Sequence, residues 1–390
     1  MKKLFLYVAA LTSCAAAFMS CEPNTQKTDT TKVWPAANSD GKVGYINAKG
    51  EFVVSPLYDD AFVFSSGLGL VTKVSTDGKS TMSFVNSKGD TKITLGTDAG
   101  ASPFCEDRAI AQMAAGGNVG AMDPSGKWSV AATYEAGNLD NFSDGLAIFA
   151  NSDNKYGAID KSGKVVVPAQ WDCLGTYCCG LARYHTGTKA DKYGYIDKKG
   201  KIVIDAASTT YDYAAFFSED LAAFVSGTKC GYIDKAGKVA IQPLYDACKG
   251  FSQGLAAVEQ NDKWGFIDKK GTMKIAAVYD DVSDFWEDLA FVLSGKTYSV
   301  IDKSGNVKIS LGEYEPVMYW FHNGLTLVCK YDTTAKKMEY KYINTKGETI
   351  YSVLIADEID LAPEKVFGEK EQIREPLQHI YSWGKTIEVR

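Results

Sequence analysis

Few residues of this 390-residue chain have the types and spacing that catalysis requires. The histidines are His185, His322 and His379, and none of them stands beside a serine or cysteine in a nucleophile motif. Acidic pairs such as Glu219-Asp220 and Glu287-Asp288 recur at corresponding places along the chain. Catalytic carboxylates have no reason to repeat, whereas loop charges do. We therefore interpret these pairs as solvated loop residues, and we expect no enzyme activity, including activity of the glycosidase type.

Cysteines supply the densest cluster of reactive side chains. Besides Cys14 and Cys21, the chain contains Cys105, Cys173, Cys178, Cys179, Cys230, Cys248 and Cys329. The group of Cys173, Cys178, Cys179 and His185 lacks the two spaced pairs of a zinc site, so we expect no metal and no other cofactor. These cysteines can be small buried thiols or can form disulfides, and both interpretations remain possible. Their number is odd, so at least one of them stays unpaired within the chain.

The charge balance excludes another class of partner. The formal net charge is −6, and the arginines are Arg108, Arg183, Arg374 and Arg390. Arginine is the preferred residue for contacts with phosphates and bases, and the chain contains no glycine loop that would cradle a phosphate. We therefore expect no nucleic-acid partner.

Most of the chain is built from a unit that recurs nine times. Its centre is an apolar residue, Asp or Asn, two further residues and Gly, as in Ile267-Asp268-Lys269-Lys270-Gly271, at steps of 34–42 residues. The Asp or Asn side chain can accept hydrogen bonds from the backbone two residues on, and Gly can adopt positive φ. The pattern predicts a hairpin turn rather than a calcium loop. A calcium loop needs several oxygen ligands, whereas each turn has one acidic or amide side chain, and the lysine that usually follows it repels a cation.

A second signature precedes each hairpin and has the form Phe, two residues, Gly or Asp, Leu, Ala, as in Phe251 to Ala256. Leu255 to Val258 then reads as a strand, and a Tyr-Asp connector such as Tyr245-Asp246 follows each hairpin. We predict an all-β fold of about nine antiparallel β-meander repeats. Each repeat has three strands, and part of the connector can add a short fourth strand. A propeller-like ring protects the sheet edges, and an open β-solenoid or superhelix is the alternative.

Aromatic residues occupy one equivalent strand position in several units: Tyr45, Tyr195, Tyr232, Phe266 and Tyr342. Such alignment is typical of packing between adjacent units, and a stacking surface for sugars is the alternative.

The chain has distinct terminal segments. Residues 1–20 combine Lys2-Lys3 with an apolar run and resemble a bacterial lipoprotein signal, with Phe18 to Cys21 as the lipobox and Cys21 as the lipid-attachment site. Leu11 to Cys14 is a second match, and an ordinary cleaved signal is another alternative. We expect residues 21–32 to form a flexible tether, residues 33–353 the repeat array, and residues 354–390 a C-terminal cap.

The string Lys263-Trp264-Gly265-Phe266-Ile267-Asp268, with Phe285 and Leu289-Ala290 after it, resembles the WG-repeat family of bacterial proteins. Most units depart from the pattern at the tryptophan, where Val43, Tyr156 or Cys230 stands, for example. The resemblance implies a β-repeat scaffold and carries over no catalytic residue. Together with the N-terminus, it implies a Bacteroidetes-type envelope lipoprotein.

We therefore expect an envelope-anchored scaffold that binds a protein or peptide, on the periplasmic or surface side of the outer membrane. Glycan binding and, less favoured, an enzyme such as a glycoside hydrolase are the alternatives. The segments between the Tyr-Asp connector and the Phe vary most between units. Loops on a rigid scaffold commonly carry function, so the predicted contact residues are Trp286, Tyr319 and Trp320.

Overall fold

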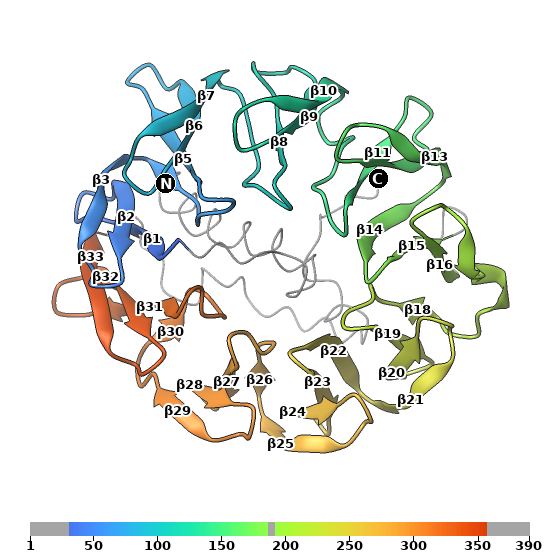
Figure 1. The fold of residues 1–390 in the computed structure, drawn as a ribbon. Helices are drawn as coiled ribbons and strands as arrows, with labels where there is room; N and C mark the ends of the chain where they lie inside the picture. Colours follow the sequence, from blue (N-terminus) through green and yellow to red (C-terminus); the bar gives the residue numbers. More distant parts are fainter. Residues whose placement is uncertain (1–30, 186–191, 357–390) are drawn as a thin grey trace.

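The computed structural model describes residues 31–185 and 192–356. In these two ranges the chain forms nine antiparallel sheets and one 3-10 turn, η1 (Ala206–Ser208), without an α-helix. Figure 1 shows the sheets arranged as blades in a closed ring, with β1–β3 beside β30–β33. The fold is that of a nine-bladed β-propeller. The prediction of an all-β ring of nine meanders is confirmed, and the open superhelix is wrong.

The nine blades follow one another along the chain. Blades 1 to 3 contain β1 (Val33–Ala37), β2 (Val43–Asn47), β3 (Phe52–Tyr58); β4 (Asp60–Ala61), β5 (Gly69–Val74), β6 (Ser80–Val85), β7 (Thr91–Thr97); and β8 (Ala109–Ala111), β9 (Val119–Met122), β10 (Trp128–Tyr134). Blades 4 to 6 contain β11 (Leu146–Ala150), β12 (Tyr156–Asp160), β13 (Val165–Trp171); β14 (Leu174–Cys178), β15 (Leu181–His185), β16 (Tyr193–Asp197), β17 (Ile202–Ile204); and β18 (Tyr213–Ala214), β19 (Leu221–Ser226), β20 (Lys229–Asp234), β21 (Val239–Tyr245). Blades 7 to 9 contain β22 (Ala247–Ser252), β23 (Leu255–Gln260), β24 (Lys263–Asp268), β25 (Met273–Tyr279); β26 (Asp281–Val282), β27 (Leu289–Ser294), β28 (Thr297–Asp302), β29 (Val307–Ser310); and β30 (Glu315–Pro316), β31 (Leu325–Asp332), β32 (Lys337–Asn344), β33 (Thr349–Ala356).

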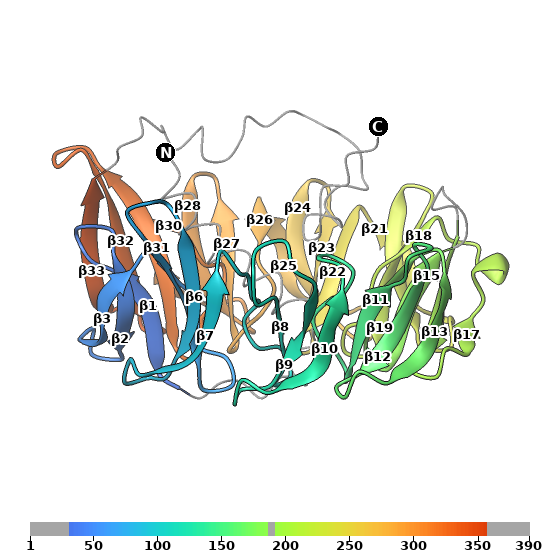
Figure 2. The same ribbon diagram turned by 90° about the horizontal axis from the view of Figure 1, so that it is seen from above.

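Each full blade begins with a short inner strand and ends with an outer strand. In blade 7, for example, β22 lies towards the centre of the ring and β25 on its outside (Figure 1). Seen from the side, the strands run between the two faces of the ring (Figure 2). Because every antiparallel turn reverses direction, the turn after the inner strand and the Asp-Gly turn lie on the same face. The predicted fourth strand is therefore the inner strand, and it comes first in its blade.

The predicted Asp-Gly turn is present and has the expected geometry. Asp268 Oδ1 accepts hydrogen bonds from the N–H groups of Lys270 and Thr272, each at 2.9 Å. Gly271 has a φ of +79°, and a Cβ there would lie 3.2 Å from Ile241 Cγ2 of the preceding blade. The glycine is therefore required by its φ, and its lack of a side chain also permits contact between neighbouring blades.

The glycine that follows the tryptophan position has a separate cause. Between Trp264 and Phe266 the ladder with β25 shifts register, because Trp264 pairs with Tyr279 and Phe266 pairs with Ile275. The bulged outer strand crosses so close that a Cβ on Gly265 would lie 2.5 Å from Ile275 O. Blade 8 has Ser299 at this position, and its ladder continues without a shift from Ser299 to Val300.

Aromatic rings pack the junctions between blades. The rings of Tyr232 and Phe251, from blades 6 and 7, have centroids 4.8 Å apart, and the Tyr232 hydroxyl donates to Lys249 O at 2.8 Å. The same ring contact recurs at 4.8 Å in the pairs Tyr45–Phe64, Tyr195–Phe217 and Phe266–Phe285. Packing between units, rather than a sugar-stacking surface, is therefore the role of the aligned aromatic residues, which are all buried.

The ring closes between blades 9 and 1. Tyr342 occupies the same strand position as Tyr232, and its hydroxyl donates to Pro35 O of β1 at 2.6 Å. Trp34 Nε1 donates to His322 O at 2.6 Å, and Tyr351 OH donates to Ala37 O at 2.7 Å. One apolar cluster contains residues of both blades, so the closure buries a continuous core.

Candidate functional site

The acidic pairs on the inner turns connect neighbouring blades. Glu219 and Asp220 form the centre of a two-residue turn, with φ of +50° and +71°, which non-glycine residues adopt at a cost. The Glu219 carboxylate accepts the N–H of Gly254 in the next inner turn, at 3.0 and 3.2 Å. Glu287 accepts in the same way from Asn323 and Gly324, at 2.6 and 2.8 Å. The prediction that these are only solvated loop charges is therefore wrong for the glutamates.

The aspartate of the Tyr-Asp connector forms an equivalent bridge on the opposite face. Asp246 Oδ1 accepts a hydrogen bond from Lys229 Nζ of blade 6 at 2.6 Å. Its Oδ2 accepts one from the N–H of Asn261 of blade 7 at 3.1 Å. The hydrogen bond from Lys229 lowers the pKa of Asp246. Asp280 has the same two kinds of partner, Lys263 at 2.5 Å and Gly295 N at 2.6 Å.

Lysines of the Asp-Gly turn join the inner-turn acids, which leads to a first prediction. Lys269 Nζ lies 3.1 Å from Glu219 Oε2, whose side chain is 9% exposed, and it also donates to Glu219 O at 2.9 Å. Lys235 pairs with Asp220, whose side chain is 72% exposed.

We expect Lys269→Ser to lower the free energy of unfolding by about 1 kcal/mol and Lys235→Ser to leave it within about 0.3 kcal/mol. Urea unfolding of the two variants measures the difference, and equal midpoints would contradict the distinction.

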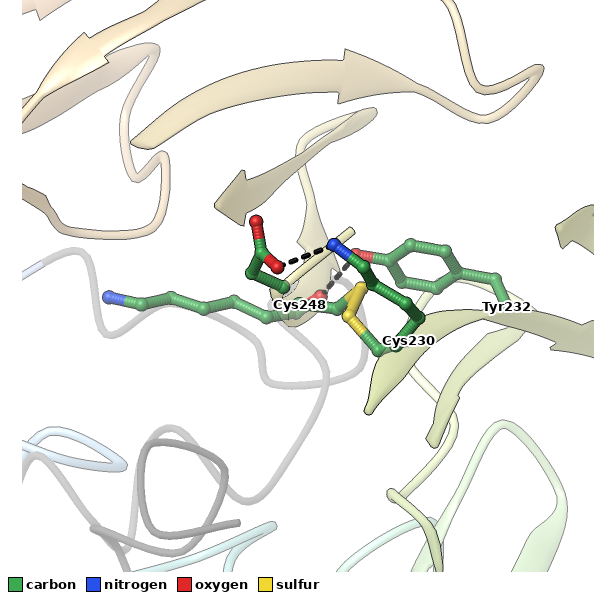
Figure 3. The surroundings of a disulfide bond; sticks show 6 residues. Cys230, Tyr232 and Cys248 are labelled. Atoms are coloured by element: carbon green, nitrogen blue, oxygen red, sulfur yellow. Dashed lines mark hydrogen bonds and ion pairs between the residues drawn. A yellow bond between two sulfur atoms is a disulfide. The ribbon is translucent and has the colours of Figure 1, made fainter. Parts of the chain in front are cut away.

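A disulfide joins blades 6 and 7. Cys230 of β20 and Cys248 of β22 are bonded, with Cα atoms 6.1 Å apart (Figure 3). Figure 3 also shows Tyr232 on the same strand as Cys230, with its hydroxyl bond to blade 7 beside the disulfide. Trp264 and Val282 occupy the corresponding positions at the next junction and belong to one apolar cluster. The disulfide therefore replaces an apolar contact of the repeat.

The sequence contained the signal for this pairing, although the prediction did not use it. Cys230 stands at the tryptophan position and Cys248 two residues after the connector aspartate, so both fall on regular repeat positions. The other described cysteines form no disulfide. In the described ranges no group of three or more His, Cys, Asp or Glu residues is arranged to hold a metal ion. The cluster at Cys173 to His185 is thus not drawn together into such a group.

One acid of the connector pairs is buried instead of bridging. Asp60, which follows the bridging Asp59, is 8% exposed in β4. Burial raises the pKa of Asp60 to about 7, although the N–H of Ala61 acts to lower it. A single carboxyl of this kind does not make the converging set of unlike groups that a catalytic site needs.

Trp286 occupies an inner turn position at which blades 2, 4, 6 and 7 have serine. In blades 6 and 7 the hydroxyls of Ser218 and Ser252 donate to Phe251 O and Phe285 O of the next blade, at 2.5 and 2.6 Å. An indole cannot reproduce that hydroxyl bond. Trp286 is half-buried, and its backbone still closes the turn with Leu289. It therefore departs from the repeat without disturbing the turn.

Tyr319 and Trp320 are adjacent in sequence but contact different blades. The Tyr319 ring lies 6.0 Å from Tyr298 and 6.1 Å from Phe291 of blade 8, and its hydroxyl lies 3.3 Å from that of Tyr298. Trp320 packs against the cluster shared by blades 9 and 1. Both are half-buried, so Tyr319 is in large part a packing residue and Trp320 partly one.

The tryptophan-glycine unit recurs in sequence as well as in structure. The WG containing repeat matches residues 44–74, 120–156, 156–184, 193–230, 231–264 and 264–298, about half of the chain. This chain belongs to the WG-repeat family. The WG repeat corresponds to a span that runs from one blade into the next, since 231–264 begins in β20 and ends in β24. The family shows the scaffold and not its ligand. No curated protein matches the chain.

Solved propellers resemble the WG-repeat ring in fold. A eukaryotic initiation factor matches with a TM-score of 0.56 and 10% identity, over 83% of this chain and 96% of that chain. AztD from Citrobacter koseri matches with a TM-score of 0.40 and 12% identity, over 83% and 94% of the two chains. A streptogramin B lyase matches with a TM-score of 0.34 and 15% identity, over 62% and 89%. Only the first likeness has a TM-score high enough to be informative, and at 10% identity it shows the fold alone.

Proposed function

We propose that this protein is a non-enzymatic scaffold of the cell envelope that binds a protein or peptide. One observation carries the proposal: the polar residues that recur from blade to blade are engaged in turns and in bridges between blades. The carboxylates of Asp268, Glu219 and Asp246 all have such structural partners. Recognition is then left to residues that depart from the repeat, as loops and irregular positions carry function on rigid scaffolds.

Trp286 and Trp320 are the contact residues that best fit this role. Each is half-buried, so a large amphipathic ring is partly available to a partner, and tryptophan is enriched where protein interfaces gain most of their energy. Tyr319 contributes less, because its ring and hydroxyl already pack against blade 8.

Glycan binding loses the feature that suggested it. The aligned rings of Tyr45, Tyr195, Tyr232, Phe266 and Tyr342 are each at most 1% exposed. They cannot stack on a sugar while they hold the blades together. A glycan array therefore serves as a control measurement, for which we expect no specific signal.

The proposal places the protein at a membrane through the lipid on Cys21, which lies outside the described residues. Within the described ranges, no helix is long and apolar enough to cross a bilayer. Disulfides form in oxidising compartments, so the Cys230–Cys248 bond supports an exported location.

The lipid anchor gives a second prediction. Lipid chains contribute about 0.8 kcal/mol per buried CH₂ group, and several chains together hold a protein firmly. We expect Cys21→Ser to move the protein from the membrane fraction to the soluble fraction, and Cys14→Ser to leave it with the membrane. Membrane fractionation with immunodetection measures both. The reverse pattern would assign the lipobox to Cys14.

Co-purification from the native envelope tests the binding function. The wild type, Trp286→Ser and Trp320→Ala are compared after cross-linking, with Trp286→Ser restoring the residue found at Ser218 and Ser252. We expect a protein partner that is recovered with the wild type and lost with the tryptophan variants, at unchanged folding. Equal recovery with all three would place the binding surface elsewhere. A measurable hydrolase or transferase activity of the purified protein would contradict the proposal.

A further inference from the structure

Arg183 is a charged residue at a position that is otherwise apolar. It is the third residue of β15, and the residue at the equivalent strand position is Leu70, Ala223, Ala257, Phe291 or Leu327 in the other full blades. These five equivalents are all buried, between 1% and 3% exposed. An isolated guanidinium costs free energy at such a site unless it is compensated. The exception therefore needs a reason that the repeat does not supply.

Aromatic rings from two blades surround the guanidinium. Arg183 Cζ lies 5.0 Å from the ring centroid of Tyr193 in its own blade, and 5.2 and 4.5 Å from those of Tyr213 and Phe216 in blade 6. Phe216 remains 41% exposed. A Cβ on Gly175 would lie 2.5 Å from Phe216 Cε1, so the glycine makes room for this ring. Cation–π contacts of this kind keep the arginine charged and in place.

Only one nitrogen of the guanidinium has protein acceptors. Nη1 donates to Tyr213 OH at 2.8 Å and to Ala214 O at 2.7 Å. Among the described residues, Nε and Nη2 have no acceptor, and no carboxylate pairs with Arg183. Arg183 is half-buried, and none of its nitrogens is both fully enclosed and without a hydrogen bond in the described part of the chain. The free edge of the fork therefore points to an outside acceptor.

We propose that Arg183 is the anchor of a binding site for a carboxylate of the partner peptide, with Phe216 contacting an apolar group next to that carboxylate. Nε and Nη2 present two parallel N–H groups, which match the two oxygens of a carboxylate. The site lies at the junction of blades 5 and 6. It rests on the proposed function, because it assigns the partner's chemistry and one point of contact.

The balance of charge favours a carboxylate over a phosphate. The site contributes one guanidinium, and it therefore compensates the single charge of a carboxylate. A phosphate ester carries close to two charges at neutral pH and offers three acceptor oxygens, which one fork leaves partly unmatched. The rings beside the fork are apolar and suit the side chain that accompanies a peptide carboxylate.

A spectroscopic titration tests the site without the native partner. The sequence contains four arginines, so a ¹H–¹⁵N spectrum of the arginine Nε–Hε groups is simple, and Arg183→Leu identifies the signal of Arg183. The probes are N-acetylphenylalanine, its amide, and phenyl phosphate. We expect N-acetylphenylalanine to shift the Arg183 signal in a saturable way, the amide to leave it unmoved, and phenyl phosphate to bind at least about 10-fold more weakly. No shift with the carboxylate, or equal shifts with carboxylate and amide, would overturn the proposal. Tighter binding of phenyl phosphate would assign a phosphorylated partner instead and would also overturn it.

Stability separates this role from a structural one. Arg183→Leu introduces the residue found at Leu70 and Leu327, so we expect an unchanged or higher melting temperature together with loss of the probe's saturable binding. A lower melting temperature with retained probe binding would show that the arginine is only a structural residue. Arg108→Leu is the matched control: Arg108 bonds to the carbonyls of Lys161 and Asp107, and its replacement should leave probe binding unchanged. Because the probes need no envelope partner, their failure would leave the wider scaffold function to the co-purification experiment.

Discussion

Gly265→Ala is expected to lower the free energy of unfolding by about 2–3 kcal/mol. The added Cβ would lie 2.5 Å from Ile275 O and 2.6 Å from Ala277 N, and both are backbone atoms that cannot turn aside as a side chain can. The outer strand must move, and the bulge that aligns Trp264 with Tyr279 must be lost or displaced. The midpoint of urea unfolding, followed by intrinsic fluorescence, measures the effect.

Ser299→Ala is the matched control in blade 8. Ser299 occupies the position of Gly265, but its ladder with β29 is regular there and accommodates a side chain. We expect a change of less than about 0.5 kcal/mol. If Gly265→Ala and Ser299→Ala shifted the midpoint equally, the bulge would not be the reason for the glycine.

Removal of the disulfide is expected to lower the free energy of unfolding by a similar amount, because the unfolded chain gains conformational freedom. The bond closes a loop with a sequence separation of 18 residues, and a loop of this length restricts the unfolded chain by about 3 kcal/mol. We expect the pair Cys230→Ala and Cys248→Ala to lower the free energy of unfolding by about that amount. Urea unfolding under oxidising conditions measures the loss.

A reducing agent provides the control for this prediction. Reduction should destabilise the wild type to near the level of the double variant and should leave the double variant itself unchanged. The contacts beside the disulfide, Tyr232 to Lys249 and Lys229 to Asp246, remain in both cases. A double variant as stable as the oxidised wild type would show that the bond adds nothing to the junction.

Local features of the fold were predictable because the turn and strand chemistry repeats. Asp268 and Gly271 indicate a hairpin, because the aspartate side chain can accept backbone hydrogen bonds and the glycine can adopt positive φ. Trp264 and Phe266 indicate one face of a strand, because they alternate along it. The sequence did not decide between a closed ring and an open superhelix. It depends on the contact of Tyr342 with Pro35, two residues at opposite ends of the array that no local pattern connects.

The candidate site was less predictable for a related reason. Glu219 and Asp246 look like surface charges in the sequence, and only the assembled junctions bring them to the N–H groups of the next blade. Tyr319 looks variable, yet it packs on Tyr298 because blade 9 lies against blade 8. Arg183 was detectable in principle, because alignment of the repeats by strand position places it among apolar residues.

Some residues of the chain build the ring and others serve a partner, and one comparison tests this division directly. The wild type, Trp286→Ser, Arg183→Leu and Gly265→Ala are each measured for melting temperature and for recovery of the partner from the native envelope. We expect Trp286→Ser and Arg183→Leu to keep or raise the melting temperature and to lose the partner. Gly265→Ala should instead lower the melting temperature and, below that temperature, retain the partner. A fall in melting temperature for Trp286→Ser and Arg183→Leu, with the partner still recovered, would contradict the account.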